Sequence, residues 1–380
     1  MSRPLRVAWL GHRAAKGGDG IITYSREITA GLRDRGVQVL FFHHAPEFRD
    51  DDDSIALDAV RLSHRLVLSP PRTRRLVEAK LRSLEVDLVH VSFSFSTLDF
   101  NLPDVCHSLG LPLVATFHVP FDTRLGLWPR VSRTLYRIYS QVLAGCDAVI
   151  VFSDVQKRML SDLGVPGGVI HVLPNGVDVD KYRPGPSNKK EALGAKRLFI
   201  YLGRLDPEKN VDHLLAAFLE IDPPPGLKLM LVGGGSERRR LERRFHDRRI
   251  VFTGTVTEER ERIAILRSSD AFVLPSSIEG LSLAMLEAMA CGVATVATDV
   301  GSDGDALRGA GFVLDPDHLD AELRAALRLL VEVPSLCREL GRLARERAVE
   351  RYSLSRNLDG LLRVYRALVK RYPMPGTASM

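Results

Sequence analysis

The sequence lacks several features that would place it in other protein classes. No apolar run reaches the roughly eighteen residues needed to cross a bilayer. The N-terminus enters a strand-like run at 5–10 without a signal-peptide pattern. The four cysteines, Cys106, Cys146, Cys291 and Cys337, are scattered without metal-ligand spacing. Reduced thiols in a cytoplasmic protein are therefore expected.

A complete dinucleotide fingerprint is also absent. The glycine turn at 231–237 ends a strand-like run, but it lacks G-x-G-x-x-G followed by an acidic residue at the end of the next strand. This absence argues against an NAD-dependent oxidoreductase. No nucleic-acid recognition motif supports a nucleic-acid partner.

The composition indicates a globular protein of two domains. The chain has 380 residues, of which 45% are hydrophobic and 26% are charged. The net charge is 53 − 47 = +6, which suits an anionic substrate or a membrane surface.

Short apolar runs alternate with helical patterns along most of the chain. The strand-like runs lie at 5–10, 37–42, 88–91, 113–117, 148–152, 198–202, 229–232, 250–252, 271–274 and 294–297. Such β-α alternation predicts parallel, doubly wound sheets, with ligand sites at the carboxyl ends of the strands. A Pro-, Gly- and charge-rich segment at 181–190 is interpreted as a linker. We therefore expect an N-terminal domain at 1–183 and a C-terminal domain at 191–354.

Two acids flank a predicted helix start in the second domain. Glu279 follows the run at 271–274 and a Pro-Ser-Ser turn, and Glu287 lies inside a strong helix former. Gly280 suits a tight turn and Ser282 suits a helix N-cap. Free N–H groups beside carboxylates suit a polyhydroxylated, anionic ligand. The alternative is a surface helix with two incidental glutamates.

Two cations lie on an earlier strand-to-helix loop. The segment Tyr-Leu-Gly-Arg-Leu-Asp-Pro-Glu-Lys-Asn at 201–210 contains Arg204 and Lys209. Arginine offers a planar fork and lysine a point charge, a combination suited to a diphosphate. Solvated surface charge beside a helix cap is the alternative.

These motifs resemble those of the retaining GT-B glycosyltransferases of family 4. The frame E-G-L-S-L-A-M-L-E-A-M-A-C-G at 279–292 fits the family signature, with Ser282 where the family often has Gly. The frame at 201–210 is similar to the family's G-R-x-x-x-x-K-G/N motif. The resemblance covers nearly the whole chain. It implies an α/β fold of two Rossmann-like domains facing across a cleft, with a last helix at about 355–372 crossing back to the N-terminal domain.

The resemblance also implies roles for residues of the second domain. Glu279 would lie near the donor sugar, and Glu287 would bind the ribose hydroxyls. Arg204 and Lys209 would stabilise charge on the leaving diphosphate. The remaining donor-binding positions that it implies are Gly234, Val256, Ser282 and Leu283.

In the N-terminal domain the implied positions lie on loops after strands. Gly17 and Gly18 match a glycine turn that meets the donor phosphates. His118 would line the reaction centre, although Val119 stands where the family frequently has Asp. Asp122 and Arg124 are weaker candidates for acceptor contacts. A flexible loop without ligand and a satisfied core histidine are the alternatives.

The implied reaction moves a sugar from a UDP- or GDP-linked donor to a hydroxyl acceptor, with retention of configuration. The acceptor would be a sugar, a lipid-linked compound or a small molecule. No metal and no other cofactor are expected, because cationic side chains and helix N-termini supply the positive charge. A GT-B nucleotide-sugar epimerase or phosphorylase is the alternative, and a nucleotide-binding module without turnover is a third.

The segment 128–139 leaves membrane contact open. Arg130, Arg133 and Arg137 recur there at near-helical spacing beside aromatic residues. Such a face suits peripheral docking on anionic lipid at the inner membrane face. A solvated helix with one buried stripe is the alternative.

Overall fold

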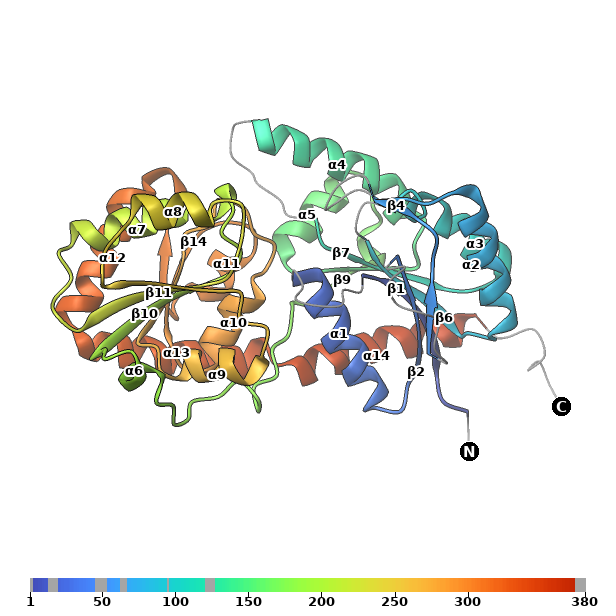
Figure 1. Ribbon diagram of the computed structural model, residues 1–380. Helices are drawn as coiled ribbons and strands as arrows, with labels where there is room; N and C mark the ends of the chain where they lie inside the picture. The colour runs from blue at the N-terminus through green and yellow to red at the C-terminus, as the bar shows by residue number, and fades with distance from the viewer. Residues whose placement is uncertain are drawn as a thin grey trace. The chain divides into compact units, whose positions relative to one another are not determined.

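The computed structural model divides the chain into two units, each built on its own parallel sheet (Figure 1). The described residues are 3–12, 20–44, 53–61, 67–93, 96–119 and 127–372, with only the backbone described at 61 and 127–133. Unit 1 contains the described residues up to Val119, those from 127 to Pro174 and those from Asn357 onward, and unit 2 contains Asn175–Arg356. Two Rossmann-like α/β units confirm the expected fold class.

Unit 1 has a seven-stranded sheet in the order β3-β2-β1-β6-β7-β8-β9, and all its pairs are parallel. The strands are β1 (Arg6–Gly11), β2 (Gln38–His43), β3 (Ser54–Ala56), β6 (Leu88–Phe93), β7 (Leu113–Phe117), β8 (Ala148–Val151) and β9 (Ile170–Val172). The central strands are buried throughout, which explains their unbroken apolar runs. The sequence did not predict β3 and β9, which have three residues each.

Helices and a hairpin complete the described part of unit 1. The helices are α1 (Gly20–Arg33), α2 (Pro71–Ser83), α3 (Leu102–Leu109), α4 (Leu127–Ala144), α5 (Asp154–Asp162), and the 3-10 turns η1 (Asp99–Asn101) and η2 (Gly167–Val169). The short antiparallel hairpin pairs β4 (Val60–Arg61) with β5 (Val67–Leu68). The predicted helix after β1 ends as expected, because Gly36 adopts a left-handed conformation with φ +79°.

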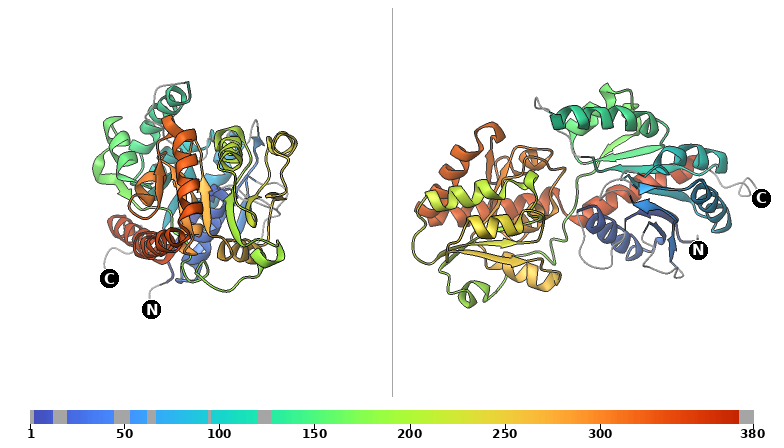
Figure 2. Two further views of the ribbon diagram at one scale, coloured as in Figure 1. Left: turned by 90° about the vertical axis from the view of Figure 1, so that its left-hand side faces the viewer. Right: turned by 45° about the horizontal axis from the view of Figure 1, so that its top comes forward.

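Unit 2 is also built on a parallel sheet, which Figure 2 shows from two further sides. Its six strands follow the order β12-β11-β10-β13-β14-β15. The strands are β10 (Arg197–Leu202), β11 (Leu227–Val232), β12 (Ile250–Gly254), β13 (Ala271–Leu274), β14 (Ala294–Thr298) and β15 (Phe312–Leu314). The helices are α6 (Lys189–Ala192), α7 (Val211–Glu220), α8 (Arg238–Arg244), α9 (Glu259–Arg267), α10 (Leu283–Ala290), α11 (Asp303–Leu307), α12 (Leu319–Glu332) and α13 (Pro334–Arg351), with η3 (Pro207–Lys209) and η4 (Pro316–His318).

The last helix, α14 (Leu354–Arg371), begins in unit 2 and joins unit 1 from Asn357 onward. Within unit 1 it lies beside α1 (Figure 1). Gly31 of α1 leaves room for Leu358, since an added Cβ would stand 2.3 Å from the Leu358 Cδ1 atom. These contacts explain why the final helix of the chain belongs to the first unit.

The segment 181–190, interpreted from composition as a linker, lies inside unit 2. The Lys181 ammonium is 3.0 Å from Glu259, and Lys190 is 2.8 Å from Asp270. Its charges therefore hold it against α9 and the start of β13. The change of unit occurs earlier, between Pro174 and Asn175.

A buried polar network connects α14 to the sheet of unit 1. The Tyr365 hydroxyl contacts His90 Nδ1, and His90 Nε2 lies 2.8 Å from Thr116 Oγ1. Trp9 stacks on the His90 ring with centroids 4.1 Å apart. Burial lowers the pKa of His90 well below its usual value, with His118 adding to the effect. A neutral imidazole can donate one hydrogen bond and accept another, so two hydroxyls satisfy it.

We expect Tyr365→Phe to lower the free energy of unfolding by about 1–3 kcal/mol, because it leaves a ring nitrogen of His90 buried without a partner. Tyr372→Phe is the matched control, since Tyr372 bonds Asp147 at 2.5 Å near the surface. This control should change stability by less than about 1 kcal/mol. Urea denaturation measures both variants, and equal effects would contradict the role given to the network.

Candidate functional site

Lys209 and Glu279 meet at the carboxyl edge of the unit 2 sheet. Lys209 ends η3 on the loop after β10, and Glu279 lies on the loop after β13. The Lys209 Nζ atom is 2.6 Å from Glu279 Oε1, and the two side chains are 12% and 14% exposed. Because β10 and β13 pair in parallel, both loops leave the sheet at the same edge. The sequence placed both residues on such loops but did not predict that they form an ion pair.

Two hydrogen bonds to backbone carbonyls join these two loops. The Ser277 N–H donates to the Glu208 carbonyl at 2.8 Å, and Asn210 Nδ2 donates to the Pro275 carbonyl at 3.0 Å. Asn210 adopts a left-handed conformation with φ +49°, which asparagine tolerates better than most residues. The residues on both sides of Lys209 are therefore hydrogen-bonded to the loop that carries Glu279.

Arg204 lies on the same loop, and its side chain is 49% exposed. Its guanidinium donates to Asp206, and to Glu208 at 2.8 Å. Burial alone would raise the pKa of Asp206, but hydrogen bonds from Ser236 and the Arg204 charge lower it overall. Arg204 therefore lies between two acidic side chains and still reaches solvent, where it can bind an anion.

The glycine turn after β11 packs against the loop that carries Arg204. An added Cβ on Gly233 would stand 1.8 Å from the Gly203 carbonyl oxygen, and one on Gly235 would stand 2.4 Å from that of Leu205. For Gly234 the added Cβ would meet Thr255 Oγ1 at 2.8 Å. Close packing explains Gly233 and Gly235 through the loop that carries Arg204, and Gly234 through Thr255 after β12. Val256 follows β12 at the same edge and is half-buried.

Helix α10 begins where the sequence predicted. Ser282 is its N-cap, and the Ser282 hydroxyl accepts from the Met285 N–H at 3.3 Å. Leu283 is the first helical residue and is half-buried. The Asn175 side chain donates to the Leu281 carbonyl at 2.8 Å and so secures the chain entering the helix. A helix N-terminus of this kind favours an anionic ligand.

Glu287 lies in a different charge environment from Glu279. It is buried on α10, and its carboxylate raises the pKa of Tyr182, although burial contributes more to that shift. Burial lowers the pKa of Arg262, but Glu287 and neighbouring groups raise it overall. The Arg262 guanidinium donates to the Tyr182 hydroxyl at 3.4 Å. Tyr182 and Arg262 are thus neighbours of Glu287 that the sequence motifs did not identify.

In unit 1, His118 follows β7 and is held by a serine from β6. Its Nε2 atom lies 2.8 Å from Ser92 Oγ, and Tyr24 packs edge-on with ring centroids 4.8 Å apart. Burial, followed by the charge of His12, lowers the pKa of His118 to about 3. The imidazole is therefore neutral near pH 7, and it can form hydrogen bonds but carries no charge.

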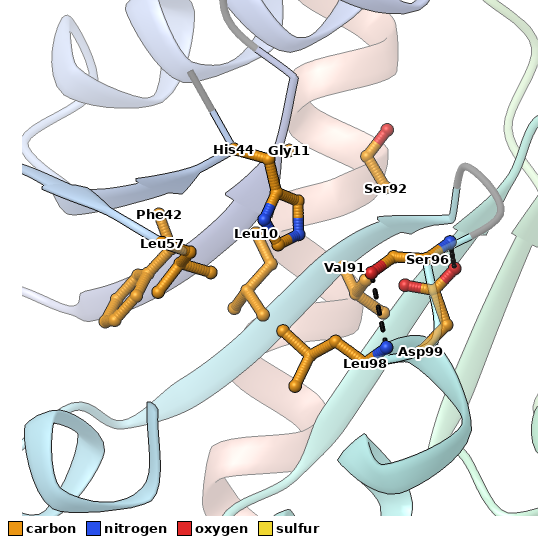
Figure 3. A pocket seen from close by; sticks show the side chains of 10 residues that line it. All are labelled: Leu10, Gly11, Phe42, His44, Leu57, Val91, Ser92, Ser96, Leu98 and Asp99. Atoms are coloured by element: carbon orange, nitrogen blue, oxygen red, sulfur yellow. Dashed lines mark hydrogen bonds between the residues drawn. The ribbon is translucent and has the colours of Figure 1, made fainter. Parts of the chain in front are cut away.

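A small pocket opens beside Ser92, at the carboxyl ends of β1, β2 and β6 (Figure 3). Its apolar lining comes from Leu10, Phe42, Leu57, Val91 and Leu98, and its polar lining from His44, Ser92, Ser96 and Asp99. The Ser96 N–H donates to Asp99 Oδ2 at 3.0 Å, and this contact shapes one wall. The pocket lies at the sheet edge where a doubly wound unit binds ligands.

Four predicted site residues, Gly17, Gly18, Asp122 and Arg124, lie outside the described residues. Within the described ranges, no cluster of three His, Cys, Asp or Glu side chains could hold a metal ion. All four cysteines are buried and free. No helix in the described part of the chain is long and apolar enough to span a membrane.

Two family models match this chain over separate ranges. Glycosyltransferase Family 4 matches residues 18–181, and Glycosyl transferases group 1 matches residues 196–332. The chain belongs to the family 4 glycosyltransferases. The resemblance seen in the motifs at 201–210 and 279–292 is therefore confirmed.

Named relatives of this glycosyltransferase differ in how much of the chain they match. This chain is 34% identical to a D-inositol 3-phosphate glycosyltransferase of Rhodococcus erythropolis over 251 residues. The matched region covers 61% of this chain and 56% of that protein. This match spans little more than half of the relative. An MMP alpha-(1->4)-mannosyltransferase of Mycolicibacterium hassiacum is 27% identical over 428 residues, covering 97% of this chain and 99% of that one.

Solved structures share the fold. Sucrose-phosphate synthase from Thermosynechococcus elongatus aligns over 97% of this chain and all of its own, with a TM-score of 0.77 and 22% identity. Anabaena HepE, solved in complex with UDP-glucose, aligns over 96% of this chain and all of its own, with a TM-score of 0.76 and 18% identity. The GT-B fold expected from the motifs is confirmed.

We expect Lys209 and Glu279 to be energetically coupled by about 1–3 kcal/mol, because both charges are mostly shielded from water. A double-mutant cycle with Lys209→Met and Glu279→Gln, followed by urea denaturation, measures this coupling. The exposed pair Arg342–Glu346 is the control and should give less than about 1 kcal/mol. Equal coupling in the two pairs would contradict the shielded geometry.

Proposed function

We propose that this glycosyltransferase moves a sugar from a nucleotide-diphosphate donor to a hydroxyl acceptor, with retention of configuration and without a metal. The observation that carries the proposal is the Lys209–Glu279 pair at the carboxyl edge of the unit 2 sheet. Arg204 adds a half-exposed cation on the same loop, and α10 adds a capped helix N-terminus to that unit. These groups suit a diphosphate bound beside a sugar hydroxyl.

In the proposed step, the bond from the sugar's anomeric carbon to the diphosphate oxygen breaks. A bond from the same carbon to the acceptor oxygen forms on the same face. Lys209 and Arg204 stabilise the negative charge that develops on the leaving diphosphate. The leaving diphosphate accepts the acceptor's proton, so no separate general base is assigned. Arg204 leaves Asp206 and Glu208 to contact the phosphate.

The other predicted contacts complete the proposal. Glu279 accepts hydrogen bonds from the donor sugar, and Glu287 accepts them from the ribose. His118 is neutral, and it hydrogen-bonds the transferred sugar. Backbone groups near Gly234 and Val256, with Ser282 and Leu283 at the start of α10, contact the nucleotide and its phosphates. Gly17 and Gly18 are proposed to meet the same phosphates.

The donor base is proposed to be uracil or guanine. HepE was solved with UDP-glucose, which supports a UDP-sugar. A relative from Mycobacterium tuberculosis is named as a GDP-mannose-dependent mannosyltransferase acting on a phosphatidylinositol monomannoside, with 30% identity over 221 residues. The acceptor is accordingly proposed to be a sugar, a small molecule or a lipid-linked compound, with Asp122 and Arg124 as its weakest assigned contacts.

In a panel of UDP-, GDP- and ADP-sugars, we expect nucleoside diphosphate release from either the UDP- or the GDP-sugars and not from the ADP-sugars. Arg204→Ala and Lys209→Ala should each lower turnover by about 10²–10³, because each removes a preorganised charge from the leaving group. Glu287→Ala should raise the donor KM through the lost ribose contact. Arg239→Ala, an exposed arginine of the same unit, should leave turnover unchanged.

The panel also discriminates between the alternatives. Turnover that proceeds without any acceptor and yields a rearranged sugar would favour an epimerase, and dependence on inorganic phosphate would favour a phosphorylase. Binding without turnover would indicate a nucleotide-binding module. Failure to bind or turn over any nucleotide sugar would contradict the proposed function.

Peripheral membrane contact through unit 1 is proposed as the route to a lipid-linked acceptor. Phe100 and Ile138 are each 45% exposed, and Phe100 lies 5.4 Å from the ring of Tyr139 on α4. Arg137, also exposed on α4, adds a positive charge. Exposed apolar side chains beside a cation are typical of a surface that binds anionic lipid.

We expect the protein to co-sediment with vesicles containing phosphatidylglycerol at low salt, and less at high salt. Ile138→Glu should weaken this binding severalfold, because it places a negative charge on the lipid-facing surface. Leu329→Glu in unit 2, which starts from a similarly exposed apolar side chain at 41%, is the control. Absence of binding at every salt concentration would remove the membrane proposal.

A further inference from the structure

Asp303 is a fully buried acid next to the loop that carries Glu279. It begins the short helix α11 and is 0% exposed. Its Oδ1 atom accepts from the Ser282 N–H at 2.7 Å, at the N-cap of α10. Its Oδ2 atom is buried and has no hydrogen-bond partner in the part of the chain that the structure describes. Nothing in the sequence motifs marked this residue.

The backbone around Asp303 supports the Glu279 loop directly. Gly301 adopts φ +59°, and an added Cβ there would stand 2.2 Å from the Glu279 carbonyl oxygen. The Ser302 N–H donates to the Gly280 carbonyl at 2.6 Å. The hydrogen bond from Ser282 to Asp303 extends this contact to the start of α10. The segment 301–303 therefore holds both ends of the loop 279–282.

The surroundings of Asp303 disfavour a negative charge. A buried carboxylate needs a cation or several hydrogen-bond donors to remain charged. Among the described residues, Asp303 accepts a hydrogen bond from one backbone N–H, that of Ser282. The charged and titratable groups acting with it are Glu279 and Lys209 on the neighbouring loops, and Tyr352 after α13. Burial and then Glu279 raise the pKa of Asp303 well above its usual value, although Ser282 and Lys209 oppose them.

We infer that Asp303 is a positioning residue of the donor site that keeps its proton in the folded protein. As a neutral acid it accepts the hydrogen bond from the Ser282 N–H and adds no negative charge beside the Glu279–Lys209 pair. The donor-site role of Asp303 rests on the proposed function, because a negative charge at Asp303 would repel the diphosphate that the site is proposed to bind. The protonation itself does not depend on any activity.

Thermal unfolding across pH tests the protonation without substrate. Above the ordinary aspartate pKa of 3.8, the unfolded chain loses the proton that the folded chain retains. The stability of the wild type should therefore fall relative to that of Asp303→Asn as pH rises from about 5 to about 8. Asp305→Asn, an exposed acid on the same helix, is the matched control and should run parallel to the wild type. A Tm difference between wild type and Asp303→Asn that is constant over this range would overturn the inference.

Kinetics and binding test the positioning role. Asp303→Asn retains an oxygen acceptor for Ser282 and carries no charge, so turnover and the affinities for UDP and GDP should stay within about threefold of the wild type. Asp303→Ala loses the acceptor, and kcat should fall roughly ten- to a hundredfold as the loop shifts. Wild-type kcat and KM in Asp303→Ala would exclude a positioning role. Tighter UDP or GDP binding by Asp303→Asn, by more than about fivefold, would show that Asp303 is charged.

The two proposals can fail separately. If Asp303→Ala does not fold, the pH series and the Asp303→Asn kinetics still decide the inference. If the wild type binds no nucleotide and turns over no nucleotide sugar, the proposed function and the donor-site role of Asp303 are both lost. The pH dependence would then still decide whether Asp303 keeps its proton.

Discussion

The parallel pairing of β10 with β13 is the constraint on which the candidate donor site depends. The two strands are neighbours in the sheet although about seventy residues separate them in the chain. Their loops leave at one edge, where Lys209 meets Glu279 and where the backbone joins Glu208 to Ser277. Other features of unit 2 support this edge. The glycines after β11 let the loop after that strand pack closely against the loop that carries Arg204. The segment after β14 supports the loop that carries Glu279.

Much of the architecture could be predicted from the sequence because both sheets are parallel and buried. Such strands are unbroken apolar runs, and the limits of β7 and β13 agree with the predicted runs to the residue. Short strands such as β9 and β15 carry too few residues to show a pattern. The segment 181–190 shows the limit of composition, because prolines and charges indicate exposure but not which partner the charges contact. Lys190 and Asp270 are paired through the fold, which local sequence cannot show.

The candidate site was predictable to the extent that it rests on motifs. Ser282 was predicted as the N-cap of α10, and it is. The resemblance implied that Gly234 contacts the donor, and the structure adds that the glycines at 233–235 pack closely against neighbouring loops. Asp303 escaped notice because a buried acid and an exposed one look the same in a sequence. Its burial arises from contacts between loops after β13 and β14, and only the sheet order brings these together.

A crystal structure of the chain with bound UDP or GDP tests the central claim most directly. The account predicts that an oxygen of the β-phosphate lies within hydrogen-bonding distance of Lys209 Nζ, with Arg204 turned from Asp206 toward the same phosphate. Glu287 should then contact the ribose. A nucleotide bound away from the carboxyl ends of β10 and β13, or bound there without a phosphate contact to Lys209 or Arg204, would contradict it.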